Sequence, residues 1–231
     1  MSELDKTIGG NIRLYRRANH ITLEELAGRI HKSKATLGKY EQGTISLDVN
    51  TLWEIAAALQ MEPEQLLKNL HPAGGTETGG ASPGSGRQYL YIYDGRAKRI
   101  LRSLLAGGGA EEENPPLTLF YDVPDFEQLH RCRTLYYGRR QRQDMVIHYA
   151  FKNQSNGVER VNITLMRSLE LEGRGTGLMT GLSARRLLPV CVKCILSTRM
   201  LEENEELIDA LLLTKEDMRL TRKNNMFMVE M

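Results

Sequence analysis

The apolar positions between Thr22 and Gly43 repeat at helical spacing in two short blocks separated by a polar turn. Thr22 and Glu25 have the spacing of a capping box, in which each side chain bonds a free backbone N–H at the start of a helix. After the turn Ser33 offers a second N-cap, and Gly43 follows the last apolar position. The pattern therefore predicts two short helices joined by a turn.

The second predicted helix buries its apolar side chains and leaves small and basic ones exposed. Leu37 and Tyr40, three residues apart, mark the buried side. The exposed side carries Lys34, Ala35, Thr36, Gly38 and Lys39. Short and basic side chains on an exposed helix suit the major groove of DNA, where lysine donates to guanine and a methyl group contacts thymine.

At these residues the sequence resembles the Cro-like (XRE-type) helix-turn-helix family of transcriptional regulators. The resemblance runs from about Ile8 to Leu70 and covers five helices, the last of which Pro63 is placed to begin. It implies an all-α DNA-binding domain over residues 1–70. His31 stands where the family usually has glycine, so a left-handed backbone there would cost about 1 kcal/mol.

The resemblance also assigns roles to individual residues. It places at the DNA Lys32, Ser33, Lys34, Ala35, Thr36, Lys39 and Thr44. Of these, Lys34, Ala35, Thr36 and Lys39 would face base edges, and the others would hold phosphates. The family also has an ion pair that ties its first helix to the end of its third, and Arg16 and Glu41 match it. Leu23 stands where a glutamine often reaches a phosphate, so one backbone contact is expected to be missing.

The helical domain is predicted to end before a linker rich in small residues. Trp53 shares a helical face with Ile55 and Leu59 and is predicted to lie in the core of the domain. Residues 71–87 are mostly Gly, Ser, Thr, Ala and Pro, which bury too little surface to fold. A flexible coil of this length spans roughly 20–25 Å. The two halves of the chain are therefore predicted not to be rigidly coupled through this segment.

From Gln88 onwards strand and helix patterns are mixed. Strands are predicted at residues 88–93, 117–123, 144–151, 158–166, 178–183 and 189–197. Residues 94–105 fit either a helix that begins at Asp94 or the return strand of a hairpin turned at Asp94–Gly95. Helices are predicted at 124–132, at 201–213 and, behind a second capping box of Thr214 and Asp217, at the end of the chain. This mixture predicts an α+β domain over residues 88–231.

Composition and charge are those of an ordinary soluble protein, with 41% hydrophobic and 26% charged residues and a net charge of +2. No apolar run approaches the roughly 18 residues of a membrane helix, and the first ten residues lack the apolar stretch of a signal peptide. The three cysteines form no disulfide framework. These features predict a bacterial cytoplasmic protein that does not contact membranes. The net charge is too small to indicate nucleic-acid binding by itself.

Two short motifs can each be explained by a structural role as well as by a chemical one. Cys191 and Cys194 have the spacing of a zinc knuckle, with Cys132 and His130 as conceivable partners. However, residues three apart on a strand point to opposite faces, and buried cysteines are commoner. Residues 173–177, GRGTG, lack the Lys-Ser/Thr of a phosphate loop and are predicted to be a flexible strand connection. The sequence therefore predicts no metal and no cofactor.

A dense run of arginines leaves a ligand role open. It comprises Arg131, Arg133, Arg139, Arg140 and Arg142, interleaved with Tyr136 and Tyr137. The run could bind a phosphate-bearing ligand or DNA. The alternative is a solvated strand edge, where charge discourages aggregation.

An enzymatic role is not predicted. Some phage-type repressors cleave themselves at an Ala–Gly bond, and Ala73–Gly74 lies in the linker, but no C-terminal serine has the expected Ser-Met context.

The sequence predicts a transcriptional regulator, in particular a repressor, that binds a palindromic operator as a homodimer. Its C-terminal domain would sense an unidentified small-molecule effector or set the dimer, with Leu201–Leu213 and the last six residues as the dimer contact. The alternative is an antitoxin or adaptor whose C-terminal domain binds another protein.

Overall fold

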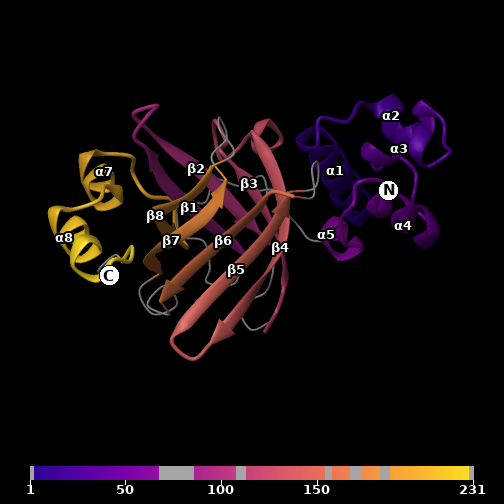
Figure 1. The fold of residues 1–231 in the computed structure, drawn as a ribbon. Coiled ribbons are helices and arrows are strands. Elements are labelled where there is room, and N and C mark those ends of the chain that lie inside the picture. The colour runs from indigo at the N-terminus through magenta and orange to yellow at the C-terminus, as the bar shows by residue number, and fades with distance from the viewer. Residues whose placement is uncertain are drawn as a thin grey trace.

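The computed structural model shows a helical domain, a β-barrel and a pair of C-terminal helices, in that order across the molecule (Figure 1). The structure describes residues 3–67, 86–107, 113–153, 158–166, 173–182 and 188–228. Most of the predicted linker, with Ala73–Gly74, lies outside these ranges, and the first strand begins at Arg87. No helix within the described ranges has the length and apolar character that crossing a membrane requires.

Five helices form the N-terminal domain. They are α1 (Glu3–Ala18), α2 (Leu23–Arg29), α3 (Lys34–Glu41), α4 (Val49–Ala58) and α5 (Pro63–Leu67). The Thr22 capping box and the Ser33 N-cap confirm the predicted starts of α2 and α3. His31 has a φ of 52°, the left-handed conformation expected from the sequence. Helices α1 and α3 meet at Gly9, where an added Cβ would lie 2.2 Å from the carbonyl oxygen of Tyr40.

The prediction that Trp53 lies in the core is wrong, because Trp53 is 60% exposed. Helix α4 buries Thr51, Ile55 and Ala56. At 100° per residue, position 53 lies on the side of the helix opposite positions 51 and 55. The indole instead lines a groove between the helical domain and the barrel, together with Met61 and Tyr137 among others.

The C-terminal region is a closed antiparallel barrel of eight strands, so the predicted α+β class is wrong. The strands are β1 (Arg87–Asp94), β2 (Arg99–Ala106), β3 (Pro116–Tyr121), β4 (Thr134–Gln143), β5 (Val146–Asn153), β6 (Arg160–Met166), β7 (Arg174–Leu182) and β8 (Pro189–Ser197). Each strand pairs with the next along the chain. Strands β1 and β8 also pair, with Leu90 opposite Leu196, and this pairing closes the barrel.

Burial on both faces explains the ambiguity at β2. Leu101 and Leu105 belong to the core inside the barrel. Leu104 packs outside it against the helical domain, and Ile100 packs outside it near the C-terminal helices. A strand buried on both faces does not alternate between apolar and polar residues. The four apolar positions 100, 101, 104 and 105 therefore have the same spacing as one face of an amphipathic helix. The hairpin alternative was the correct one, since β2 pairs with β1 beyond Asp94.

The helix predicted at residues 124–132 is also wrong. This segment is a loop with one 3₁₀ turn, η1 (Leu129–Arg131). Val123, Leu129 and Cys132 are buried in the hydrophobic cluster that the barrel shares with the helical domain. These apolar residues are therefore buried by contact with the helical domain and not on one face of a helix.

Two helices follow the barrel, α7 (Glu205–Leu211) and α8 (Lys215–Asn224). The capping box of Thr214 and Asp217 is present at the start of α8, as predicted. Leu207 and Leu211 pack with Tyr91 and other outward side chains of the barrel. Figure 1 shows both helices on the side of the barrel away from the helical domain.

The helical domain packs against the outer face of β3 and β4 through buried side chains. The Tyr15 ring lies 6.0 Å from that of Phe120 and 6.2 Å from that of Tyr137, between ring centroids. Gln65 Nε2 donates to Thr118 Oγ1 at 2.9 Å, and the Tyr15 hydroxyl lies 3.3 Å from the same oxygen. We call these five residues the docking interface. It provides a contact between the halves that does not depend on the linker.

Candidate nucleic-acid interface

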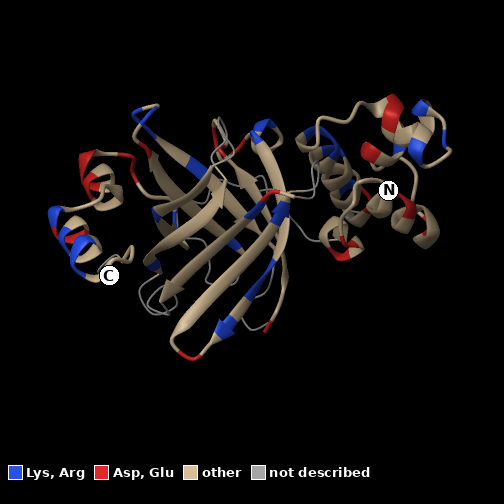
Figure 2. Ribbon diagram, in the orientation of Figure 1, with Lys and Arg blue, Asp and Glu red and all other residues tan. Residues whose placement is uncertain are grey.

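Helix α3 lies on the part of the helical domain turned away from the barrel, whereas α1 and α5 face the barrel (Figure 1). Lys34, Ala35 and Lys39 are exposed and Thr36 is half-buried. Leu37 and Tyr40 are buried and hold the opposite side of the helix in the core. Figure 2 shows Lys and Arg gathered on and around α3, and acidic residues at the start of α2. The predicted base-reading side chains therefore share one accessible face.

The start of α3 is held by hydroxyl groups. Ser33 Oγ accepts a hydrogen bond from the backbone N–H of Thr36 at 3.0 Å and lies 2.8 Å from Thr36 Oγ1. At the other end, the Thr44 hydroxyl donates to the carbonyl oxygen of Lys39 at 3.1 Å. Both termini of the helix are thereby fixed before any DNA arrives, which lowers the entropic cost of docking.

The positive charge on α3 is only loosely held within the protein. Lys34 Nζ lies 3.6 Å from Glu24 Oε2, and both side chains are largely exposed. An exposed pair of this kind contributes at most about 1 kcal/mol. The ammonium group of Lys34 is therefore held only weakly by Glu24. Lys32 is exposed beside it, just before the N-cap.

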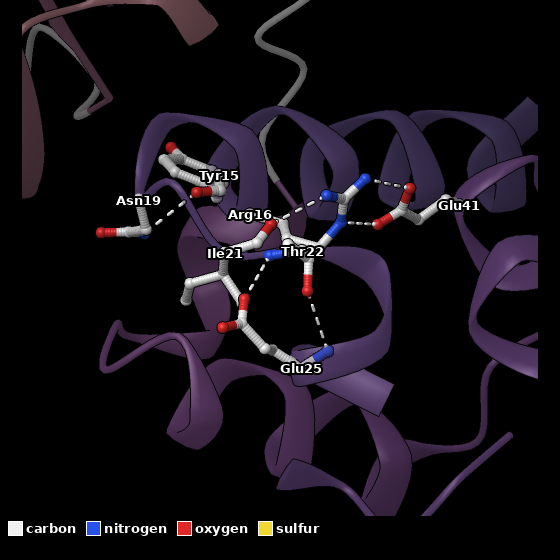
Figure 3. A network of polar contacts seen from close by, with 7 residues as sticks. All are labelled: Tyr15, Arg16, Asn19, Ile21, Thr22, Glu25 and Glu41. Atoms are coloured by element: carbon white, nitrogen blue, oxygen red, sulfur yellow. Dashed lines mark hydrogen bonds and ion pairs between the residues drawn. The ribbon is translucent and has the colours of Figure 1, made fainter. Parts of the chain in front are cut away.

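An ion pair connects α1 to the end of α3 (Figure 3). Arg16 Nε donates to Glu41 Oε1 at 2.6 Å, and Nη2 donates to Oε2 at 3.0 Å. The third donor, Nη1, reaches the carbonyl oxygen of Ile21 at 2.9 Å. The side chains are only 12% and 7% exposed. Arg16 thus joins α1, α3 and the chain just before α2, and it sets the orientation of the exposed helix.

The arginine run does not form a strand edge, because a closed barrel has none. On β4, Arg140 pairs with Tyr149 and Arg142 with Ile147, both of which belong to the core inside the barrel. Directly opposite residues share a face of the sheet, so these two arginines point inward. Arg139 points outward and donates to the carbonyl oxygen of Asn114. The sequence could not distinguish these faces.

The cysteine and glycine motifs lie in strands. Cys191 is exposed and Cys194 buried on β8, in agreement with their predicted opposite directions. Burial raises the pKa of the Cys194 thiol to about 12. Within the described ranges no group of three or more His, Cys, Asp and Glu residues is placed to hold a metal ion. The predicted flexible connection GRGTG is wrong: Gly177 belongs to β7 and lies so close to β6 that an added Cβ would be 2.2 Å from the Thr164 carbonyl oxygen.

Comparisons with known proteins concern mainly the helical domain. Residues 12–66 match the family model described as "Helix-turn-helix" (HTH_3). Among solved structures, the clp gene regulator ClgR from C. glutamicum is 25% identical and covers 29% of this chain and 87% of its own, with a TM-score of 0.28. The restriction-modification controller protein C.AhdI from Aeromonas hydrophila is 26% identical over 27% of this chain and 94% of its own, with a TM-score of 0.27.

An HTH_3 family transcriptional regulator from Vibrio cholerae spans 85% of this chain and 98% of its own, at 15% identity and a TM-score of 0.27. These TM-scores are too low to support an argument about the barrel. No curated protein matches the chain. Identification therefore rests on the family model together with the fold of the N-terminal domain.

The capped helix pair with its exposed basic helix is that of a DNA-binding regulator. Within this class, the N-terminal domain belongs to the XRE-type helix-turn-helix family, over residues 12–66.

Proposed function

We propose that the chain is a cytoplasmic transcriptional repressor that binds a palindromic operator as a homodimer and senses a small effector through its barrel. The observation that carries this proposal is α3, which lies on the part of the helical domain turned away from the barrel and leaves Lys34 and Lys39 exposed. Binding of the barrel to the helical domain leaves that face free. A barrel with a cavity supports the sensing role over the antitoxin or adaptor role.

Recognition would combine positioning by phosphates with readout of bases. Lys32, Ser33 and Thr44 flank α3 and would contact the backbone, which fixes the register of the helix on the duplex. Lys34 and Lys39 would donate to guanine O6 and N7, and the Ala35 methyl group would meet a thymine methyl group. Thr36 shares a hydrogen bond with Ser33, so its hydroxyl would read a base only in the orientation that this contact permits.

Replacing Lys34 or Lys39 by alanine should weaken operator binding by about 1–3 kcal/mol and relax specificity at one base pair. The measurement is fluorescence anisotropy on an operator selected from random DNA, with the same titration on unrelated DNA. Lys215→Ala, an exposed lysine on α8 at the opposite end of the molecule, is the matched control and should bind normally. Equal losses on operator and unrelated DNA would reduce Lys34 and Lys39 to phosphate contacts.

Two chains should bind one operator, with half-sites about 10 base pairs apart, one turn of the duplex. Removing one half-site should weaken binding by about 10²–10⁴, because two joined domains act at high effective concentration. Of the predicted dimer contact, Leu207 and Leu211 are used within the chain, whereas Leu212 and Leu213 remain exposed. Analytical ultracentrifugation with operator DNA measures the stoichiometry, and a single chain per full operator would contradict the dimer.

A further inference from the structure

One end of the barrel opens into a cavity of about 630 Å³, a volume typical of small-molecule sites. This is the end where β1 finishes and β4 begins. The apolar part of its wall comes from Ile92, Leu101, Val161, Met179 and Val192. Charged side chains, among them Arg99, Arg133 and Glu159, also line the cavity. We call this space the mouth cavity; an apolar wall with a few charged groups suits a ligand that is itself amphipathic.

The arginines that line the mouth cavity differ in how closely they are paired with acidic side chains. Arg99 Nη1 and Nη2 donate to the two carboxylate oxygens of Asp122 at 2.9 and 2.8 Å. Arg133 Nη1 lies 4.0 Å from the same carboxylate, beyond hydrogen-bond distance, and its side chain is 51% exposed. Arg96, the third arginine of the cavity wall, lies with its Nε 3.6 Å from Asp94 Oδ1. Since Arg99 holds Asp122 through both oxygens and Arg96 is nearer to its own acid, Arg133 has the longest ion-pair distance of the three, and its guanidinium has donors to offer a ligand.

The two acids of the mouth cavity, Asp94 and Glu159, both accept hydrogen bonds from protein donors. Asp94 Oδ1 accepts from the backbone N–H groups of Arg96 and Ala97 at 2.9 and 3.2 Å. Glu159 Oε1 accepts from the Tyr136 hydroxyl at 2.8 Å, and Oε2 accepts from Asn153 Nδ2 at 2.8 Å. Burial, followed by the bond to Glu159, raises the pKa of Tyr136, so this hydroxyl stays protonated and keeps donating. With each Glu159 oxygen bonded, the mouth cavity favours an anion at Arg133 over a cation at Glu159.

We propose that the mouth cavity binds a small monocarboxylate with an apolar body, the carboxylate on Arg133 and the body against the apolar wall. A guanidinium fork binds a carboxylate through two parallel N–H donors. The inference names the site and the ligand class of the sensing role proposed above and rests on that role for its regulatory consequence.

Strand β4 connects the mouth cavity to the helical domain. The Tyr136 side chain lines the cavity, while its neighbours Leu135 and Tyr137 face outward into the cluster shared with the helical domain. Successive side chains of a strand point to opposite faces, so a ligand that displaces Tyr136 also moves the residues beneath α1. Asn19 Nδ2, on the chain just after α1, lies 3.3 Å from the Tyr137 hydroxyl. Ligand binding in the cavity would thereby change the orientation of the DNA-binding domain relative to the barrel.

The test is isothermal titration calorimetry of the full chain with sodium decanoate, below its micelle concentration. We expect one decanoate per chain. Affinity should rise roughly fourfold for each methylene from hexanoate to decanoate, because each buried methylene contributes a similar increment. Arg133→Gln should weaken decanoate binding by about tenfold to a hundredfold, the loss expected for a charge-assisted hydrogen bond. The affinity of Arg133→Lys for decanoate should lie between those of the wild type and Arg133→Gln.

Arg160→Gln is the matched control, an exposed arginine at the same end of the barrel that does not line the cavity, and it should bind decanoate normally. An unchanged affinity of Arg133→Gln, an affinity independent of chain length, or binding of decyltrimethylammonium in place of decanoate would each overturn the assignment. Operator binding is measured on the same preparations. Operator binding without decanoate binding defeats only this inference, and decanoate binding without operator binding defeats only the proposed regulatory function.

Discussion

Replacing either Arg16 or Glu41 by alanine should lower the free energy of unfolding of the full chain by about 3–5 kcal/mol. Both side chains are largely buried, and the pair is joined by two hydrogen bonds. Removing one partner leaves the other charge in a poorly solvated place. Arg16→Ala also strands the carbonyl oxygen of Ile21, so it should be the more costly of the two. Urea unfolding of each variant measures the loss.

The double mutant separates a buried pair from two independent effects. Because Arg16→Ala, Glu41→Ala leaves no unpaired charge, it should cost clearly less than the two single variants added together. The exposed pair of Lys34 and Glu24 is the internal control, and Glu24→Ala should cost under about 1 kcal/mol. Small and additive effects at Arg16 and Glu41 would show that solvent screens this pair as well.

Tyr137→Ala should cost about 3–5 kcal/mol, as for other large buried aromatic side chains, and should loosen the helical domain from the barrel. The ring is buried beside Tyr15, and its hydroxyl is near Asn19 and the sulfur of Met61. Trp53, the single tryptophan, lines the adjacent groove and reports on the helical domain by fluorescence. In the wild type the unfolding transition followed by Trp53 fluorescence should coincide with the transition followed by far-UV circular dichroism. In Tyr137→Ala the two transitions should separate.

Tyr137→Phe is the matched control, since it keeps the ring and removes only two long polar contacts. It should cost under about 1 kcal/mol, the scale of one ordinary hydrogen bond, and keep a single transition. A single transition in Tyr137→Ala with little loss of stability would mean that the docking interface contributes little to coupling. The linker would then be the main connection between the two halves.

The sequence by itself determined the helix-turn-helix domain because its signals are local. Thr22 with Glu25, and Ser33 with its following N–H groups, satisfy backbone donors within one turn of helix, whatever the rest of the chain does. The same holds for Thr214 and Asp217. Glycine and proline likewise mark ends and starts through their own backbone geometry. The hairpin of β5 and β6 was also predicted, since strand alternation on both sides of a short turn is a local pattern.

Only the tertiary structure decided the barrel and the contacts around it. Closure depends on β1 meeting β8, whose pairing joins residues about a hundred positions apart, as Leu90 with Leu196 shows. Where other elements cover the outside, as at Leu104, both faces of a strand are apolar and its alternation disappears. The direction of each arginine on β4 follows from register, which a one-residue shift would reverse. The mouth cavity beside Arg133 could not be predicted from the sequence either, because its wall is formed by strands that are far apart along the chain.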